Sequence, residues 1–327
     1  MKRMIFVVCA LLLLTLCACG KPQKYSAESY DAFDTVISVT AYCRSGAEFD
    51  KLSGQAFARF SELSRKLDIY YEYSGMNNLR TLNLAAGREP VELDGETLAL
   101  LRFCREVYDI TGGRVNVAMG SVLRLWHDAR ENGVLPAEDA LRQAAEHCDI
   151  NALVIDEAAG TAYLTDGEMS LDVGAVAKGW AAQRVAEELK AGGFGDFVIS
   201  AGGNVITAGS AEGGRAWRVG VQSSEENGGI IASLDSRDEA VVTSSGSQRY
   251  VVIDGVRYHH IIDPQTLAPA KYMRSMTVVH PDSGMADALS TALFLTEPAE
   301  ALAAAEAGGY RIIMLTNDGE LTDSADR

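Results

Sequence analysis

Short stretches in which apolar and polar positions alternate recur along the chain and predict β-strands. Residues 32–42 alternate apolar with small polar side chains, the pattern of a strand with one buried face. Further strands are predicted at residues 196–200, 205–209, 217–221, 229–234, 240–243 and 276–279. We expect the strands between residues 217 and 243 to form an antiparallel meander, and hairpins to turn at Asp254-Gly255 and Asn317-Asp318-Gly319.

Longer segments carry apolar residues at the spacing of an amphipathic helix. The predicted helices span residues 47–67, 94–111, 136–148, 175–191, 286–295 and 299–307. Residues 114–123 are small and are predicted to form a loop. The chain has 327 residues, of which 47% are hydrophobic and 7 are proline, so it can bury a large core. These elements predict an α+β fold with mainly antiparallel sheets flanked by helices.

The net charge argues against a nonspecific nucleic-acid-binding protein, and the cysteines argue against a zinc- or disulfide-stabilised one. Lys and Arg number 29 against 45 Asp and Glu, for a net charge of −16 at pH 7. Such a surface opposes nonspecific binding of nucleic acid, although a local basic pocket is still allowed. Beyond the N-terminal segment only Cys43, Cys104 and Cys148 remain, and their spacing is not that of a zinc site. We therefore expect no disulfide framework, with Cys104 as a buried thiol.

The first residues have the pattern of a bacterial export signal. Lys2 and Arg3 precede an apolar run over residues 5–16, which is too short to span a bilayer but suits a signal peptide. Residues 16–20, Leu-Cys-Ala-Cys-Gly, resemble a lipobox with cleavage before Cys19 and acylation of its thiol; a cleaved signal without lipid is the alternative. We predict a signal peptide over residues 1–18, a polar tether over residues 19–30 and one domain over residues 31–327.

An acidic residue, small residues and a lysine come together at one predicted helix start. Residues 161–173 are predicted to form strand and turn that include Asp172, and Lys178 falls in the first turns of the helix that follows. Free N–H groups at a helix start stabilise an anion, and Lys178 adds a full positive charge. Asp172 can accept a ribose hydroxyl or help to hold a cation. The alternative is that Asp172 is an ordinary helix cap and Lys178 a solvated side chain.

Three oxygen-bearing side chains share one face of an apolar helix near the C-terminus. Asp287, Ser290 and Thr291 stand at positions i, i+3 and i+4. Their oxygens suit a hard cation such as Mg²⁺, which prefers oxygen ligands. The alternative is a capping acid with hydroxyl groups that bond back to carbonyl groups of the helix.

Two more groups of residues allow a functional and a structural interpretation. His259 and His260 stand at a strand end just before Asp263. They are either structural or, with His260 and Asp263 near the hydroxyl-rich turn at residues 243–246, part of a general-base or phosphate site. The link after the first long helix contains Tyr70, Tyr71 and Tyr73. These rings either stack on an aromatic ligand or cover a core edge, and the pattern alone favours the core edge.

Five motifs, in this order, resemble those of the ApbE family, the FAD:protein FMN transferases, over nearly the whole mature chain. They are Asp-Val-Gly-Ala-Val-Ala-Lys-Gly at residues 172–179, Gly-Gly-Asn at 202–204, Thr-Ser-Ser-Gly at 243–246, His-Ile-Ile-Asp-Pro at 260–264 and Ala-Asp-Ala-Leu-Ser-Thr-Ala at 286–292. The chain departs from the family pattern at residues 33–34, where Phe-Asp replaces Met-Gly, at 115–116, where Val-Asn replaces Phe-Asp, and at 267, where Leu replaces Gly. The resemblance implies an ApbE-like (T-fold-like) architecture with the cofactor cleft at the junction of sheets and helices.

The resemblance also implies roles for individual residues. FAD would be contacted by Phe33, Tyr70, Gly113, Arg114, Val115, Asn116, Asp172, Lys178 and Ile261. Mg²⁺ would be held by the carbonyl oxygen of Ala175 together with Asp287 and Thr291, with Ser290 beside them. Lys178 would neutralise phosphate charge, His260 would be the base for an acceptor hydroxyl, and Asp263 would orient that base.

The function implied is Mg²⁺-dependent transfer of FMN from FAD onto a Thr or Ser hydroxyl of an exported protein, such as a subunit of a membrane electron-transport complex. Two alternatives stay open: an FAD pyrophosphatase that produces FMN and AMP, and a flavin-binding lipoprotein without turnover. With a lipid on Cys19 the protein would be exported and anchored to the outer side of the cytoplasmic membrane, facing the periplasm.

Overall fold

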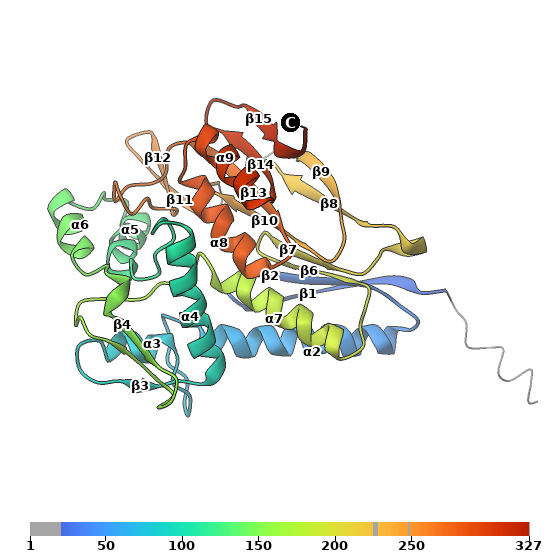
Figure 1. The fold of residues 1–327 in the computed structure, drawn as a ribbon, viewed down its shortest axis with the longest axis horizontal. Helices are drawn as coiled ribbons and strands as arrows, with labels where there is room; N and C mark the ends of the chain where they lie inside the picture. Colours follow the sequence, from blue (N-terminus) through green and yellow to red (C-terminus); the bar gives the residue numbers. More distant parts are fainter. Residues whose placement is uncertain (1–20, 225–227, 248, 327) are drawn as a thin grey trace, which may run out of the picture.

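The computed structural model describes residues 21–224, 228–247 and 249–326 and is built around one eight-stranded antiparallel sheet. The strand order is β1-β2-β6-β7-β10-β13-β14-β15 (Figure 1). In chain order these strands are β1 (Gln23–Ala32), β2 (Thr35–Cys43), β6 (Phe197–Ala201), β7 (Asn204–Ala208), β10 (Ala240–Ser245), β13 (Met273–His280), β14 (Arg311–Thr316) and β15 (Leu321–Asp323). Cross-strand pairs such as Val39 with Ile199 set a register that places buried side chains of neighbouring strands on one face.

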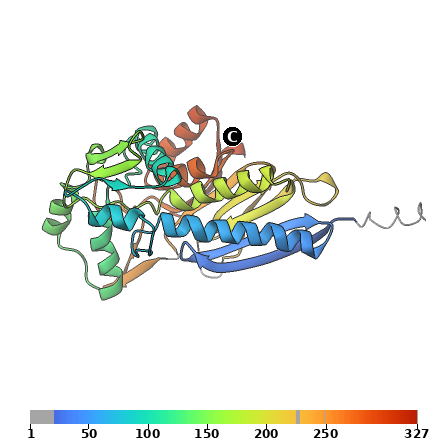
Figure 2. The same ribbon diagram turned by 90° about the horizontal axis from the view of Figure 1, so that it is seen from below.

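Three helices pack on one face of this sheet and enclose the main core. They are α2 (Gly46–Lys66), α7 (Ala177–Ala191) and α8 (Ser283–Phe294), with α7 in contact with both others (Figures 1 and 2). Phe60 on α2 and Phe197 on β6 are fully buried in this core. The free thiol of Cys104, on α4 (Gly95–Ile110), is also buried, as predicted. The α+β architecture with mainly antiparallel sheets is therefore confirmed.

A small second sheet covers the opposite face. It consists of β8 (Trp217–Gln222) and β9 (Ile230–Ser236), whose Val219 and Leu234 pack with Val241 and Ile313 of the large sheet. The predicted meander over residues 217–243 is wrong in its last strand, because β10 pairs with β7 and β13 rather than with β9. Three successive buried residues in β10 explain the difference, since a strand buried on both faces belongs in the centre of a sheet. The helix α9 (Pro298–Gly308) packs beside β14.

The remaining elements form the part of the molecule that adjoins the ends of α7 and α8 (Figure 1). They are α3 (Leu79–Leu84), α4, α5 (Gly120–Asn132), α6 (Glu138–Ala145), the sheet β3 (Val91–Glu92), β5 (Thr161–Leu164), β4 (Leu153–Asp156), and the hairpin β11 (Tyr250–Ile253) and β12 (Val256–His259). The loop predicted over residues 114–123 is wrong at its end, because α5 begins at Gly120. This helix start has no side-chain cap to mark it.

Two expectations about chain segments are also corrected. The tether predicted over residues 19–30 is wrong from Gln23 onward, since this segment forms β1 and pairs with β2. An edge strand with mostly exposed side chains has the polar composition of a linker. The strand predicted to include Asp172 ends at Leu164, and Ser170 makes only an isolated bridge to Met119.

The predicted signal peptide and Cys19 lie outside the described residues. Within the described ranges, no helix combines the length and the apolar character needed to cross a bilayer.

Candidate active site

The candidate site begins where α7 and α8 cross at Gly179. The backbone N–H of Gly179 donates to Asp287 Oδ2 at 2.8 Å. A methyl group at Gly179 would lie 2.3 Å from the carbonyl oxygen of Ser283 and 2.5 Å from Asp287 Cβ. Only glycine therefore allows the two helices to approach this closely.

Asp287 is a buried carboxylate with several donors around one oxygen. It is 4% exposed, and Oδ2 also accepts from Asn204 Nδ2 at 3.4 Å and lies 3.9 Å from Lys178 Nζ. Burial raises the pKa of Asp287, while the charge of Lys178 and the donors of Gly179 and Asn204 oppose that rise. A buried carboxylate beside one half-exposed lysine has the character of a site for a cation or for a phosphate with its counterion.

Hydroxyl groups from β10 and α8 meet next to this carboxylate. Ser244 Oγ lies 2.8 Å from Ser290 Oγ and 3.2 Å from Thr291 Oγ1. Of the three residues predicted to share a face of α8, Ser290 and Thr291 therefore meet at Ser244, while the carboxylate of Asp287 bonds to Gly179 and Asn204. Ser290 Oγ also donates to the carbonyl oxygen of Asp287 at 2.9 Å, which is the local bond foreseen in the structural alternative.

Lys178 bridges the loop before α7 and the carboxylate on α8. Its Nζ donates to the carbonyl oxygen of Gly174 at 3.2 Å while lying 3.9 Å from Asp287 Oδ2. A positive charge thus already stands between a loop carbonyl and a buried acid. Within the described part of the chain no three His, Cys, Asp or Glu side chains form a metal-binding group, so a cation here would need carbonyl and hydroxyl oxygens in addition to the carboxylate of Asp287. The oxygen atoms of Asp287, Thr291 and the carbonyl group at Ala175 are the type of ligand that Mg²⁺ prefers.

Asp172 lies in the turn before α7 and does not cap that helix. Its Oδ1 accepts from the N–H of Gly174 at 2.9 Å, whereas the cap position of α7 is Val176. The helix-cap alternative is therefore wrong. Burial raises the pKa of Asp172, and the positive charges of Arg130 and Lys178 oppose the rise. Asp172 and Lys178 both belong to the turn and first residues of α7, since the side chain of Asp172 bonds to Gly174 N–H and that of Lys178 to the Gly174 carbonyl oxygen.

The predicted loop at residues 113–116 is held mainly by its own side chains. Arg114 pairs with Glu300 at 2.6 Å, Val115 is buried, and Asn116 Nδ2 donates to the carbonyl oxygen of Cys148 at 2.8 Å. Gly113 has a φ of 80° and lies against the ring of Tyr108. The backbone then passes beside Asp172, whose N–H donates to the carbonyl oxygen of Val117 at 2.8 Å. This loop can therefore offer backbone rather than side chains to a ligand.

Two predicted aromatic contacts differ in their surroundings. Phe33 occupies the turn between β1 and β2 with a φ of 56°, and its ring meets the edge of Phe60 at 6.4 Å. Tyr70 is 60% exposed and Tyr71 69% exposed, so the core-edge interpretation is wrong for these two rings. The ring of Tyr70 lies 6.1 Å from that of His127 on α5.

His260 lies at the base of the β11–β12 hairpin. Its backbone N–H donates to the carbonyl oxygen of Arg249 at 3.1 Å, and its Nδ1 lies 3.3 Å from the same oxygen. Burial lowers the pKa of His260 to about 4, and the neighbouring His259, Arg249 and Arg130 add to the effect. The imidazole is therefore neutral at physiological pH and has the protonation state of a general base.

The residues around His260 form hydrogen bonds with nearby parts of the chain. His259 Nε2 bonds to the carbonyl oxygen of Ala270 at 2.9 Å, as the structural interpretation requires. Ile261 is buried, with its N–H donated to His259 Nδ1 at 3.2 Å. Asp263 Oδ1 accepts from the N–H of Gln265 at 2.8 Å, a bond within its own turn. Asp263 is thus engaged within its own turn, and among the described residues no hydrogen bond joins it to His260.

Four residues in this region did not stand out as site residues in the sequence. They are His127 and Arg130 on α5, Asn204 at the start of β7, and Arg249 before β11. Arg130 follows Trp126 by one helical turn, a spacing that would have pointed to the helix and its polar face. Arg249 had no pattern to mark it, because its position depends on how the hairpin docks.

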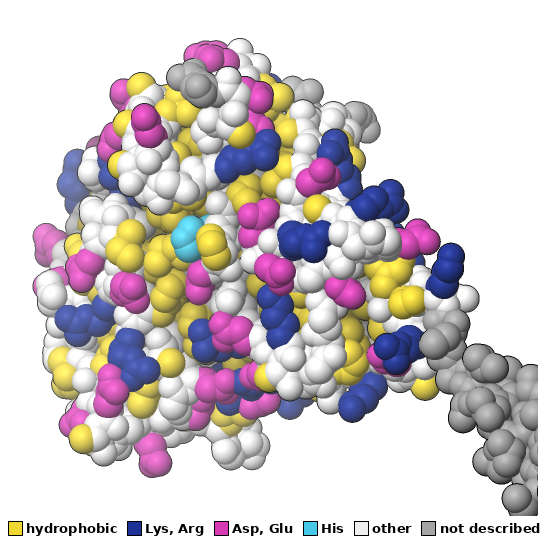
Figure 3. Space-filling view, turned by 45° about the vertical axis from the view of Figure 1, so that its right-hand side comes forward, with side chains coloured by type: hydrophobic (Ala, Val, Ile, Leu, Met, Phe, Trp, Pro, Cys, Tyr) yellow, Lys and Arg dark blue, Asp and Glu magenta, His cyan; other side chains and the backbone are white. Residues whose placement is uncertain are grey.

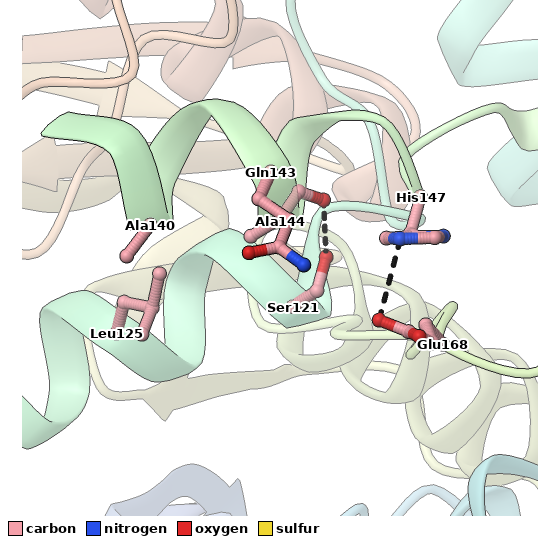
Figure 4. Close-up of a pocket in the computed structure, with 7 residues that line it drawn as sticks. All are labelled: Ser121, Leu125, Ala140, Gln143, Ala144, His147 and Glu168. Atoms are coloured by element: carbon pink, nitrogen blue, oxygen red, sulfur yellow. Dashed lines mark hydrogen bonds and ion pairs between the residues drawn. The ribbon is translucent and has the colours of Figure 1, made fainter.

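A cavity of about 300 Å³ lies elsewhere, between α5 and α6 (Figure 4). Ser121, Gln143, His147 and Glu168 are among the residues that line it, and His147 Nε2 lies 3.3 Å from a Glu168 oxygen. None of the predicted site residues lines this cavity. On the face seen in Figure 3, acidic and basic side chains are interspersed, without a broad area of one sign.

Comparison of the sequence with known proteins identifies related chains. The sequence matches the model of the ApbE family over residues 33–314. It is 37% identical over 232 residues to an FAD:protein FMN transferase of Treponema pallidum, with 66% of this chain and 64% of that protein covered. It is 27% identical over 316 residues to one of Vibrio cholerae, with 94% and 92% covered.

Solved structures share the fold over nearly the whole chain. An ApbE protein from Thermotoga maritima has a TM-score of 0.82 at 25% identity, with 93% of this chain and 98% of that chain covered. The flavin transferase ApbE from Vibrio cholerae has a TM-score of 0.79 at 24% identity with the same coverage. At this identity the second likeness shows the fold alone.

Proposed function

This chain belongs to the ApbE family, and on that basis we propose that it is an FAD:protein FMN transferase. It moves FMN from FAD onto a Thr or Ser hydroxyl of another protein. The observation that carries this proposal is the buried carboxylate of Asp287, which lies 3.9 Å from Lys178 Nζ beside the hydroxyl pair of Ser290 and Thr291. The names of the relatives support the same reaction.

In the proposed reaction the acceptor hydroxyl oxygen attacks the phosphorus of the FMN half of FAD. A new P–O bond forms to the acceptor, the P–O bond to AMP breaks, and AMP leaves with the bonding electrons. His260 takes the hydroxyl proton, for which its lowered pKa keeps it neutral. Lys178 and the positive end of the α7 helix dipole offset the negative charge of the phosphates.

The residues present fit a bound Mg²⁺ ion. Asp287, Thr291 and the carbonyl oxygen of Ala175 would hold it, with Ser290 alongside. When bound, such an ion neutralises phosphate charge. This assignment is supported by the oxygen chemistry of the donors and by the buried, incompletely neutralised carboxylate.

FAD would lie across the junction of the helices and the β11–β12 hairpin. The proposed contacts are Phe33, Tyr70, the backbone of residues 113–116, Asp172 and Ile261. Tyr70 supports this placement, because its exposed ring is available for stacking on a flavin.

The test is to incubate the protein with FAD, Mg²⁺ and a candidate acceptor and to look for flavin fluorescence on the acceptor after denaturing electrophoresis. Free FMN and AMP without labelled acceptor would indicate hydrolysis, and unchanged FAD would indicate binding alone. Asp287→Ala should abolish transfer, whereas Asp50→Ala, an exposed acid on α2, should not. Transfer at the normal rate by Asp287→Ala would refute the metal assignment.

We also propose that the protein is exported and anchored to the outer side of the cytoplasmic membrane by a lipid on Cys19. The basic residues, apolar run and lipobox-like residues 16–20 support this. The acceptor would then be an exported protein, such as a subunit of an electron-transport complex. Cys19→Ala should move the protein from the membrane to the soluble fraction, and an unchanged membrane fraction would contradict the anchor.

A further inference from the structure

Arg130 is a half-buried cation that the reaction described above leaves without a role. Its Nη2 lies 3.5 Å from His127 Nδ1. Among the described residues, no carboxylate lies within ion-pair distance of this guanidinium. Burial lowers the pKa of Arg130, which reflects the cost of removing an unpaired charge from water. A half-buried cation whose contact is an imidazole ring rather than a carboxylate is suited to an anionic partner from outside the protein.

The packing of α5 fixes where Arg130 points. Trp126, one helical turn earlier, stacks on Tyr258 of β12 at 5.9 Å and donates its Nε1–H to the carbonyl oxygen of Leu267 at 2.8 Å. Residues four apart share a helix face, so Arg130 lies on the side of α5 that faces the hairpin. Figure 1 shows α5 beside β11 and β12.

A second arginine stands at the base of the same hairpin. Arg249 precedes β11, and its carbonyl oxygen accepts from the backbone of His260 at 3.1 Å. Its Nη2 donates to Asp34 Oδ2 at 3.0 Å and to the carbonyl oxygen of Asp34 at 3.2 Å. Asp34 occupies the turn between β1 and β2 with a φ of 48°, and its side chain is 96% exposed, so this ion pair is open to water.

The two guanidinium groups act on the same neighbours. Both lower the pKa of His260, and Arg249 also lowers the pKa of Arg130. Arg130 lies on the face of α5 toward the hairpin and Arg249 lies at the base of that hairpin, so the two like charges belong to one region, where a bound anion would relieve their repulsion. The protein carries a net charge of −16, so an anionic substrate needs such a local positive region to bind.

We propose that Arg130 and Arg249 together bind the pyrophosphate of a nucleoside diphosphate group, the group that FAD shares with ADP. This rests on the proposed function and adds to it two ligand-binding residues. Guanidinium groups suit this role because their paired N–H donors match two phosphate oxygens at once. Asp34 fixes the guanidinium of Arg249 at the turn between β1 and β2, and Trp126 fixes the helix that carries Arg130.

The experiment measures binding of FAD, ADP and riboflavin to the full chain by calorimetry. Arg130→Gln is expected to weaken binding of FAD and ADP by roughly 10- to 100-fold, the loss of one charged hydrogen-bonding group. Riboflavin, which has no phosphate, should bind the variant and the unaltered protein alike. Arg130→Lys should recover part of the loss, and Arg249→Gln should show a loss of the same kind.

Arg124→Gln is the matched control, since Arg124 lies exposed on the same helix. It should bind all three ligands normally. Equal affinity of Arg130→Gln and the unaltered protein for FAD and ADP would overturn the inference, as would an equal loss in Arg124→Gln. If the unaltered protein bound neither FAD nor ADP, the proposed function itself would fail. Should Arg130→Gln not fold, as judged by thermal melting, Arg130→Lys and Arg249→Gln decide by the same comparison.

Discussion

Gly179 and Asp287 form a contact between two helices in which the acid of one helix caps the other. The N–H of Gly179 is one of the free groups in the first turn of α7, and Asp287 Oδ2 on α8 accepts it at 2.8 Å. The anion predicted for this helix start is therefore, in part, a side chain of the protein. The contact also fixes the position of Asp287 relative to Lys178.

Replacement of Gly179 by Ala should force α7 and α8 apart. The added methyl group would lie 2.3 Å from the carbonyl oxygen of Ser283. Overpacking of this kind costs about 1–3 kcal/mol of unfolding free energy. We expect a lower midpoint in thermal or denaturant unfolding, together with slower transfer because Asp287 moves. Gly54→Ala on α2 is the control, since nothing lies within 4 Å of its added methyl group, and it should stabilise slightly. Equal midpoints for the two variants would contradict this account of the crossing.

Replacement of Ser244 by Ala should weaken the hydroxyl cluster. Ser244 Oγ is the common partner of Ser290 Oγ and Thr291 Oγ1, at 2.8 and 3.2 Å. We expect a loss of about 1 kcal/mol in unfolding free energy, and a higher Mg²⁺ concentration for half-maximal transfer. Ser26→Ala removes a hydroxyl pair with Thr40 of the same length, 2.8 Å, at an exposed position and should change neither quantity. An unchanged Mg²⁺ requirement in Ser244→Ala would show that these hydroxyls do not support the metal.

Removal of β1 should destabilise the domain, although this segment has the composition of a linker. It pairs with β2 from Gln23↔Cys43 to Ala32↔Thr35. A variant that starts at Asp31 would expose the edge of β2, so we expect a lower unfolding midpoint and concentration-dependent aggregation. A variant that starts at Lys21 keeps β1 and should behave as the longer chain does. If both variants melted at the same temperature, the pairing of β1 would contribute nothing to stability.

The parts of the fold that the sequence predicts are those set by neighbouring residues. Helical spacing predicts α2, α7 and α8, and the Asp254-Gly255 turn predicts the hairpin. The pairing of β10 with β7 and β13 could not be predicted, because partners far apart in sequence are chosen by burial on both faces.

The same distinction applies to the site. Spacing along one helix predicts that Ser290 and Thr291 lie close together, and both contact Ser244. The order of the motifs predicts that they belong to the same site as Lys178. Arg130 and Arg249 come into the same region only because Trp126 packs on Tyr258 and joins α5 to the hairpin, and no local pattern in the sequence predicts this contact. The pattern alone favours the core edge for Tyr70, because an aromatic cluster is more often buried than exposed, whereas the structure leaves this ring 60% exposed.

His260 should give the transfer reaction an unusually low acid limit. Burial and then neighbouring positive groups lower its pKa to about 4, below the ordinary value of 6.5. Because the base works unprotonated, kcat/KM should not fall through this group until the pH approaches 4. The same shift means that protonation favours the unfolded chain, so stability from this group is lost as pH falls from 6.5 toward 4. Arg249→Gln removes one positive neighbour and should move the acid limb of kcat/KM to higher pH, whereas Arg124→Gln should leave it in place. An acid limb near pH 6.5 in the unaltered protein would mean that a group other than this imidazole takes the proton.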